Sequence, residues 1–370
     1  MIKTLIILVI VIFSSVSYGI LIGHYQIFPY DLLSESKALF TSNFVEKTTK
    51  NAEFYESDVN SLIQISDKND LEEKRSSLIQ YIWKQPSLPT NSNLNYEKEI
   101  EDIRYSDFTN LSSIDKISIN MENNVNSISY LFHSKNPNGH LVIYSEGHSG
   151  DFIHGSETIQ NLLSDGFDVL AFSMPLIGMN NQPVVNSDFG KIKLTTHNHF
   201  QFIESETFST IKYFLHPITI SLNFMEEEYD YLSYSMIGIS GGGWTTTIYS
   251  AIDERISHSF SVAGSLPIFL RNEPKDLGDY EQTLPELYSI SNYLELYIMS
   301  SYGENRLHVQ LFNQYDPCCF SGTNFESYED IILQKIRELD GGNFIIYLDT
   351  THDEHKISEY AQNKILIHLP

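Results

Sequence analysis

Cysteine is nearly absent from this chain of 370 residues, and the two that occur, Cys318 and Cys319, are neighbours. A disulfide between adjacent residues would be strained, so no framework of disulfides holds the fold together. Neither cysteine stands in the C-x-x-C spacing of a zinc site. We interpret both as small buried side chains, and they leave the cellular compartment open.

Basic side chains are also scarce, with 23 lysines and arginines against 48 acidic residues and a net charge of −25. A surface with this excess of negative charge repels nucleic acid and anionic lipid headgroups. We therefore expect no nucleic-acid partner. A solubilising acidic surface explains the charge, and it disfavours an enzyme that acts on acidic substrates.

Charge is missing altogether from residues 4–23, which are twenty in number. That length suffices to cross the apolar core of a bilayer, about 30 Å thick. Lys3 precedes the run and Asp31 follows it, so the positive-inside rule places the amino terminus in the cytoplasm. Residues 1–25 are predicted to be a membrane anchor with the rest of the chain extracytoplasmic. The alternative is a cleaved signal segment and a secreted protein.

A polar and mostly helical region follows at residues 26–110. Within it Asp70 can cap a helix whose apolar face carries Leu71, Leu78 and Ile82 at helical spacing. No residue pattern typical of a reaction or a ligand occurs there. We interpret residues 26–110 as a helical appendage or spacer.

Residues 111–370 have a different texture, in which short apolar runs alternate with helical patterns. Such alternation is typical of an α/β domain with a mostly parallel sheet and helices on both faces. A hairpin is predicted around the turn at 122–124. Buried strands are predicted at 141–144 and 169–172, and further strands at 257–262, 309–312 and 344–348 and in the apolar run that enters the turn at Gly238.

Two segments of this domain depart from the regular pattern. A helical pattern covers 207–224, and Pro217 within it should break or kink the helix. Residues 271–300 interrupt the alternation, with two prolines and several tyrosines. They are predicted to form a lid-like insertion over the sheet, or else a packed pair of helices without a gating role.

The run from Gly238 to Gly242 reads Gly-Ile-Ser-Gly-Gly, which is a G-x-S-x-G pattern. An apolar run precedes it and a helical pattern follows. A serine on such a strand-to-helix corner has its hydroxyl exposed, and the glycines permit the tight turn. The free N–H groups at the helix start favour a developing negative charge. A functionless Gly/Ser turn is the alternative interpretation of this pattern.

A serine nucleophile requires a base and an acid that orients the base. On a strand-to-helix corner the expected chain order is serine, acid, histidine. Ser240 is the candidate nucleophile, Asp316 the candidate acid after the strand at 309–312, and His355 the candidate base before the closing helix. All three follow strands at their carboxyl ends, where reaction sites of open α/β sheets gather.

Neighbouring residues offer alternatives to two of these assignments. His352 lies on the same loop as His355 and is the alternative base. Asp349 and Asp353 are alternative acids, although an orienting carboxylate usually comes from a neighbouring strand end. Asp316 could instead only begin an Asp-Pro turn.

An oxyanion needs two backbone N–H donors. Gly241 would supply one of them, because it directly follows the nucleophile. The other is expected from the loop after the strand at 141–144, with His148 or Ser149 as the donor. These three residues are the predicted oxyanion hole.

A metal site is a competing interpretation of the histidines. The residues that could form it are His148, Asp151, His154, His197 and His199. Their spacing is not specific, and a chain with 13 histidines produces such groupings by chance. We therefore expect no metal and no cofactor.

Together these motifs, with Phe172-Ser173-Met174-Pro175 after the next strand, resemble the α/β-hydrolase superfamily over residues 114–370. The elbow is similar to those of secreted bacterial esterases and prolyl-oligopeptidase-like hydrolases. The resemblance implies cleavage of a carboxylic ester through an acyl-enzyme, with serine peptidase as an alternative. This chain departs from the lipase pattern in one place: the oxyanion loop reads Glu146-Gly147-His148 where lipases have His-Gly-Gly-Gly. A non-catalytic binding protein on the same fold is the third possibility.

Overall fold

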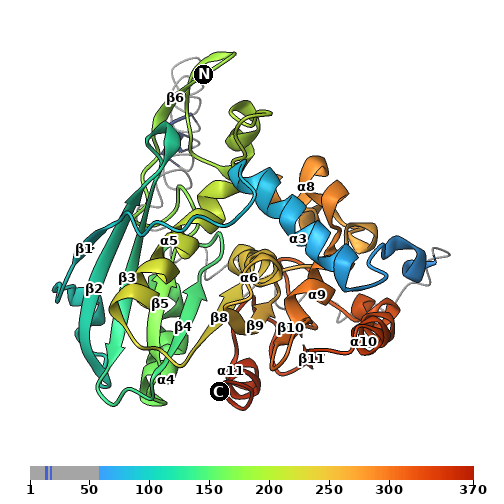
Figure 1. The fold of residues 1–370 in the computed structure, drawn as a ribbon. Helices are drawn as coiled ribbons and strands as arrows, with labels where there is room; N and C mark the ends of the chain where they lie inside the picture. The colour runs from blue at the N-terminus through green and yellow to red at the C-terminus, as the bar shows by residue number, and fades with distance from the viewer. Residues whose placement is uncertain (1–12, 16, 19–57) are drawn as a thin grey trace, which may run out of the picture. The chain divides into compact units, whose positions relative to one another are not determined.

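The computed structural model describes residues 13–15, 17–18 and 58–370 (Figure 1). The chain divides into two units, residues 1–48 and 49–370, and the few described residues of the first are helical. The predicted anchor at 1–25 falls almost entirely outside the described residues. Among the residues that are described, no helix combines the length and apolar character needed to cross a membrane. All that follows concerns residues 58–370.

The centre of this unit is a nine-stranded sheet in the order β1-β2-β3-β5-β4-β8-β9-β10-β11. The pairs from β5 to β11 are parallel, and β1, β2 and β3 join antiparallel at one edge. The strands are β1 (Asn95–Glu97), β2 (Leu111–Asn120), β3 (Asn126–Ser134), β4 (His140–Ser145), β5 (Asp168–Phe172), β8 (Ser233–Ile239), β9 (Ile256–Val262), β10 (Leu307–Asn313) and β11 (Asn343–Asp349). A separate hairpin pairs β6 (Val184–Ser187) with β7 (Gly190–Lys193).

Burial explains why the central strands could be predicted. Every residue of β5 and of β10 is buried, as in a parallel sheet covered on both faces. The register sets Val142 of β4 opposite Val169 of β5, and Ile143 opposite Met236 of β8. The predicted hairpin is confirmed as β2 and β3, joined by a turn in which Asn123 has a left-handed φ of 58°.

Helices cover both faces of the sheet, as predicted (Figure 1). One apolar core holds side chains of α4 (Ser156–Ser164) and α11 (Glu359–Leu366). The core of the other face holds side chains of α3 (Lys68–Trp83), α5 (Lys212–Glu228), α6 (Gly241–Ile252), α8 (Pro285–Ile290), α9 (Tyr293–Ser301) and α10 (Glu329–Glu338). The short α7 (Tyr280–Thr283) precedes α8.

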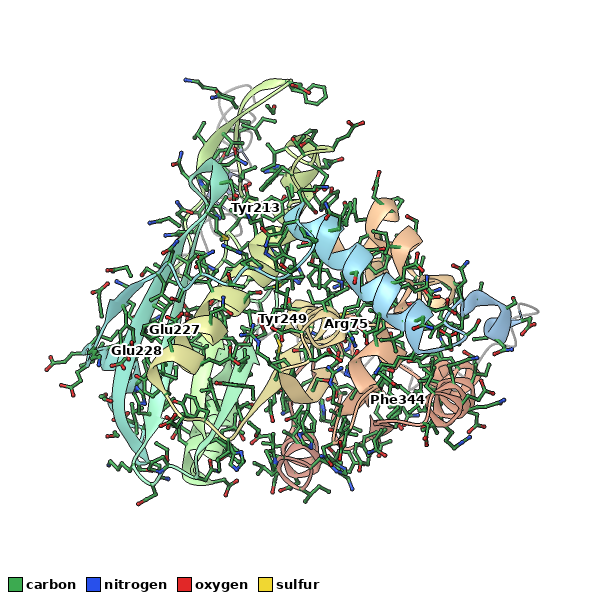
Figure 2. All side chains as sticks on the ribbon, viewed as in Figure 1. Arg75, Tyr213, Glu227, Glu228, Tyr249 and Phe344 are labelled. Atoms are coloured by element: carbon green, nitrogen blue, oxygen red, sulfur yellow. The ribbon has the colours of Figure 1, made fainter. Side chains whose placement is uncertain are left out.

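Residues 58–110 are part of this unit and do not form the separate appendage that was predicted. The helix expected there is α3, capped by Asp67 in place of Asp70. Figure 2 shows Arg75 of α3 beside α6, where its Nε donates to the backbone oxygen of Ala251 at 3.1 Å. Further along, β1 joins the edge of the main sheet through Tyr96, opposite Ile117.

The predicted lid-like insertion at 271–300 divides into two parts. All nine residues of α9 are buried, and this helix packs on α6 as the crossover between β9 and β10. For this part the structure fits the alternative of a packed helix, because α9 is buried on every side. Residues 274–290, which contain α7 and α8, remain as the insertion segment.

The helix α5 continues through Pro217, so the predicted break does not occur. The missing N–H of Pro217 would have paired with the carbonyl of Tyr213, which lies in the first turn. That turn is tight, with the N–H of Phe214 donating to Ile211 three residues back at 3.1 Å. A proline near the helix start therefore costs one hydrogen bond without ending the helix.

Candidate active site

Ser240 occupies the corner between β8 and α6, with φ 55° and ψ −126°. A non-glycine residue in this region of the backbone map carries strain of about 1–3 kcal/mol, and such strain gathers at functional sites. The side chain is half-buried, and its backbone oxygen already accepts the N–H of Trp244 at 3.0 Å. The corner therefore has the strained conformation expected of a nucleophile elbow.

The loop after β4 packs directly against this corner. A Cβ added to Gly147 would lie 2.7 Å from the Cβ of Ser240. A Cβ added to Gly241 would lie 2.5 Å from Cε1 of His148. At Gly147 the near atom belongs to the elbow itself, so glycine is required there, whereas a side chain at Gly241 would displace the ring of His148.

His355 forms a short hydrogen bond with Asp316, in which Nδ1 lies 2.7 Å from Oδ2. Asp316 is 3% exposed, and its other oxygen accepts the N–H of Cys318 at 2.8 Å. Because the carboxylate accepts, the proton of a neutral His355 sits on Nδ1 and leaves a lone pair on Nε2. That Nε2 is buried and has no hydrogen-bond partner in the described part of the chain.

The environment of His355 sets its proton affinity. Burial disfavours the charged ring, but the hydrogen bond and the negative charge of Asp316 outweigh burial and raise the pKa of His355. Ser240 and His355 are not hydrogen-bonded to each other, although both line one pocket. Such bonds are often loose in ligand-free enzymes, so this geometry suits a general base.

The alternative residues on the same loop point elsewhere. His352 Nε2 lies 3.2 Å from Asp349, and that carboxylate also accepts from Thr351 and Ser358. Asp353 is exposed. The structure therefore brings His355 to the pocket of Ser240, with Asp316 hydrogen-bonded to its ring, and it leaves His352, Asp349 and Asp353 outside the lining of that pocket.

The pocket at this corner has a volume of about 460 Å³, within the usual range for small-molecule sites. It opens at the carboxyl ends of β4, β8, β10 and β11, where open α/β sheets bind ligands. Its lining is Tyr144, Glu146, His148, Ser149, His154, Gly155, Glu157, Thr158, Ile239, Ser240, Cys318, His355, Lys356 and Ile357.

The predicted oxyanion donors lie at the same mouth. The N–H of Gly241 is the first of α6 and lacks an acceptor within the helix. Gly147 N–H is occupied by Oε1 of the buried Glu146, at 2.9 Å. The N–H of His148, next along, makes no hydrogen bond among the described residues. Of the two predicted second donors, His148 packs against Gly241, whereas Ser149 is exposed.

Glu146 was named in the sequence analysis only as part of the oxyanion loop, without a role of its own. Burial raises its pKa, although it accepts hydrogen bonds from Gly147 and from the hydroxyl of Tyr144, the latter at 2.7 Å. It thereby fixes the loop that carries His148. The only sequence signal was an acidic residue directly after a buried strand.

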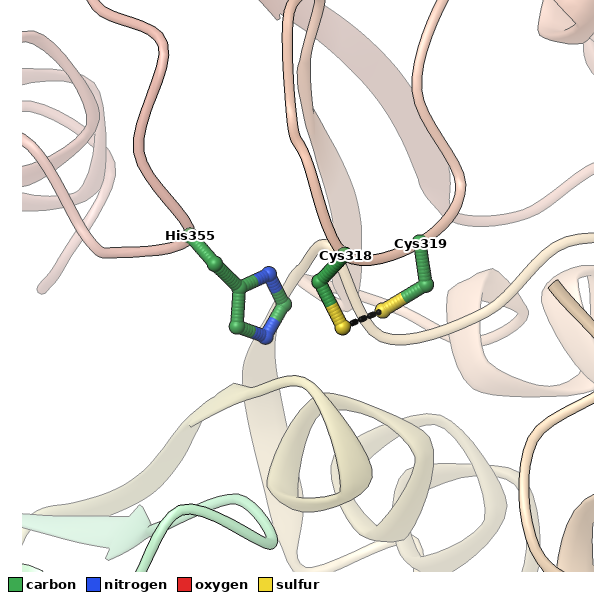
Figure 3. Close-up of side chains that lie close together, drawn as sticks. All are labelled: Cys318, Cys319 and His355. Carbon is green, nitrogen blue, oxygen red and sulfur yellow. Dashed lines mark hydrogen bonds between the residues drawn. The ribbon is translucent and has the colours of Figure 1, made fainter. Parts of the chain in front are cut away.

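Cys318 also lines the pocket, and the prediction that both cysteines are buried was wrong for it. Cys318 is exposed and Cys319 is buried. Figure 3 shows the ring of His355 beside Cys318, and the two sulfurs and a ring nitrogen lie within 4.8 Å of one another. A hydrogen bond from Cys319, at 2.9 Å, and the charge of His355 lower the pKa of the Cys318 thiol.

A second group of titratable side chains lies beside the pocket. Of the five histidines and carboxylates considered as metal ligands, the structure brings together His148 and His197. Two residues that the sequence analysis did not consider, Asp279 and Glu281, complete this group. The remaining three are not part of it: Asp151, His154 and His199.

Comparisons with known proteins bear on the fold. The sequence matches no protein-family model and no curated protein. Among solved structures, acetyl xylan esterase 1 from a Thermoanaerobacterium species has a TM-score of 0.54 at 11% identity, covering 81% of this chain and 92% of its own. An acetyl xylan esterase from a Paenibacillus species has a TM-score of 0.53 at 14% identity, covering 84% and 98%.

A glucuronoyl esterase from Solibacter usitatus has a TM-score of 0.51 at 12% identity, covering 81% of this chain and 91% of its own. At such identities the likeness concerns the arrangement of the elements. The chain therefore has the α/β-hydrolase fold that its sequence resemblance predicted.

Proposed function

We propose that the chain is a carboxylic ester hydrolase in which Ser240 is the nucleophile, His355 the base and Asp316 the orienting acid. One observation carries the proposal. Ser240, strained at a strand-to-helix corner, shares a pocket with His355. The Nδ1 of His355 is hydrogen-bonded to the buried carboxylate of Asp316. The names of the matched structures, acetyl xylan and glucuronoyl esterases, favour esters as the substrate class.

In the first half-reaction Ser240 Oγ attacks the carbonyl carbon of the ester, and His355 Nε2 takes the hydroxyl proton. Asp316 holds the ring in position and stabilises its charged form. The negative charge that develops on the carbonyl oxygen is stabilised by the N–H groups of Gly241 and His148. The imidazolium then donates its proton to the alcohol oxygen, which leaves, and an acyl group remains on Ser240.

In the second half-reaction water replaces the alcohol. His355 Nε2 removes a proton from the water, and the resulting hydroxide attacks the acyl carbon. The second tetrahedral intermediate uses the same two backbone donors. His355 returns the proton to Ser240 Oγ as the acid product leaves, so the free enzyme is restored and no cofactor is consumed.

Hydrolysis rates on matched substrates test the proposal. We expect p-nitrophenyl esters with acetyl, butyryl and octanoyl groups to be cleaved by the wild type and not by Ser240→Ala. Aminoacyl p-nitroanilides should be cleaved far more slowly. A preference for the anilides would favour the peptidase alternative, and no turnover of either class would favour a non-catalytic binding protein.

We also propose that residues 1–25 anchor the chain in a membrane and leave the hydrolase unit outside the cytoplasm. The support is the uncharged run at 4–23 and the position of Lys3 before it. The full chain should sediment with membranes after carbonate washing, whereas residues 26–370 should stay in the supernatant. Sedimentation of the shortened chain would contradict this, and a mature amino terminus inside the run would indicate a cleaved signal.

A further inference from the structure

Four side chains from three separate segments converge beside the active-site pocket. They are His148 on the loop after β4, His197 at the start of a short 3-10 helix (His197–Phe202), and Asp279 and Glu281 on the insertion segment. One nitrogen or oxygen from each of them lies within 4.8 Å of all the others. His148, His197 and Asp279 also line a second pocket of about 760 Å³.

The separations of these atoms are compatible with ligation of one metal ion, with either oxygen of Glu281 within reach of an imidazole. His148 Nε2 lies 3.0 Å from His197 Nδ1, 3.1 Å from Glu281 Oε1 and 3.3 Å from Asp279 Oδ2. His197 Nδ1 lies 3.4 Å from Glu281 Oε2 and 3.8 Å from Asp279 Oδ2. Zinc bonds of roughly 2.0–2.2 Å set tetrahedral ligand atoms about 3.3–3.6 Å apart, which lies within the range of these separations.

Proton positions also favour a cation at the centre. His197 Nε2 lies 2.9 Å from the backbone oxygen of Pro175, which can only accept, so Nε2 carries a proton. In a neutral His197 the lone pair on Nδ1 then faces the carboxylates of Asp279 and Glu281. Lone pairs that face each other repel. A metal ion between them would accept these lone pairs, so the nitrogen and the carboxylate oxygens would become its ligands. A histidine that donates its second N–H to a backbone carbonyl is typical of metal sites.

Glu281 supplies an independent indication. Its side chain is fully buried, and Oε2 has no hydrogen-bond partner among the residues that the structure describes. A buried carboxylate is costly unless it is paired or binds a metal. Two carboxylates carry two negative charges, which one divalent cation neutralises when both imidazoles are neutral.

We propose that His148, His197, Asp279 and Glu281 bind one divalent metal ion, with Zn²⁺ favoured by the mixed imidazole and carboxylate donors. The metal ties the insertion segment to the loop that carries His148. Since the His148 ring packs on Gly241, the metal also fixes the loop beside Ser240. Its role is structural, and the ester chemistry of Ser240 does not pass through it.

Metal content and affinity of the full chain test this site. After removal of metals with a chelator, titration with Zn²⁺ against a chromophoric competitor should give one equivalent per chain. Glu281→Gln keeps the shape of the side chain and should weaken binding at least 100-fold, as should His197→Ala. His199→Ala, two residues after His197 on the same short helix, is the matched control and should bind as the wild type does.

Thermal melting supplies a readout that does not depend on activity. Saturating Zn²⁺ should raise the melting temperature of the wild type and of Ser240→Ala, and it should leave that of Glu281→Gln unchanged. Zinc binding by an inactive Ser240→Ala protein separates this site from the proposed hydrolase function. Cobalt in place of zinc should give a tetrahedral visible spectrum without a thiolate charge-transfer band.

Two results would overturn the proposal. If the wild type binds less than a tenth of an equivalent of Zn²⁺ and its melting temperature does not respond, the group is a hydrogen-bonded network with protonated histidines. If Glu281→Gln keeps the metal and Cys318→Ser loses it, the ion belongs to the cluster of Cys318, Cys319 and His355.

Discussion

His352 and His355 are three residues apart on one loop, yet each has a carboxylate of its own. His355 binds Asp316 at 2.7 Å and lines the pocket of Ser240, whereas His352 lies 3.2 Å from Asp349, among the caps of α11. Sequence position favoured His355 because it comes just before the closing helix. The geometry places it in the arrangement that was predicted, and its role as base remains a proposal.

Replacing the two histidines separately tests the assignment of the base. We expect His355→Ala to lower kcat/KM by roughly 10⁴ or more, because the variant lacks the base proposed to take the Ser240 proton. His352→Ala is the matched control from the same loop, and it should change kcat/KM by less than about tenfold. Steady-state kinetics on an acetyl ester measures both variants. Equal losses, or a larger loss in His352→Ala, would make His352 the base.

The pH profile should report the charge of Asp316. His355 acts as a base only when it is neutral, and its pKa is raised, so kcat/KM should fall with decreasing pH at a midpoint above about 6.5. The Asp316→Asn variant loses the negative charge that raises the pKa of His355, while the burial that lowers this pKa remains. The acid limb should therefore move to lower pH, and the plateau should fall roughly 10⁴-fold. An unchanged acid limb would show that another group controls it.

At the scale of elements, the contact between the β4 loop and the start of α6 decides whether the site can form. This contact joins segments about ninety residues apart and has no room for a side chain at Gly147 or Gly241. The buried side chain of Glu146 holds the loop by accepting a hydrogen bond from the N–H of Gly147. Small changes here should alter catalysis more than they alter folding.

Gly147→Ala tests that contact. The new methyl group would meet the Cβ of Ser240 at 2.7 Å, so the loop or the elbow must move and the donor at His148 loses its position. We expect kcat/KM to fall by about 10²–10³, as for loss of an oxyanion donor, with the fold retained by circular dichroism. Gly341→Ala, where the nearest atom is 3.4 Å away, is the control. Full activity in Gly147→Ala would contradict the account.

Local patterns predicted most elements, because apolar runs and helical periods reflect burial directly. They failed where the deciding contact is remote. The three residues of β1, Asn95–Glu97, have no apolar pattern and become a strand only by pairing with β2. The pairing of His148 with Glu281, 133 residues later, leaves no trace in residue spacing. Cys318 was wrongly predicted to be buried, because its place in the sequence does not reveal that its loop faces a pocket.

At the scale of the whole unit, α3 belongs to the core of the α/β fold and packs against its central helices. Its Arg75 side chain is 5% exposed, donates to Ala251 of α6, and forms ion pairs with Glu72 at 2.8 Å and Glu254 at 3.0 Å. Lys74 of the same helix pairs with the buried Glu295 of α9 at 3.1 Å. Because these contacts cross between elements far apart in sequence, residues 58–370 should unfold together.

Arg75→Ala tests this integration. We expect a single unfolding transition whose free energy is lower by about 2–3 kcal/mol, because buried hydrogen bonds and packing are lost together. Urea denaturation followed by circular dichroism measures the change. Lys68→Ala at the exposed start of α3 should alter it by less than about 0.5 kcal/mol. A separate early transition for α3 would instead support an appendage.

The measurement closest to the central claim is mass spectrometric mapping of a fluorophosphonate adduct on the intact wild-type chain. The strained serine, the buried His355–Asp316 pair and the pocket that Ser240 and His355 share require the phosphonyl group to be attached to Ser240. The Ser240→Ala protein should carry no adduct. An adduct on Cys318 or another residue, or none on a correctly folded wild type, would contradict the assignment of Ser240 as nucleophile.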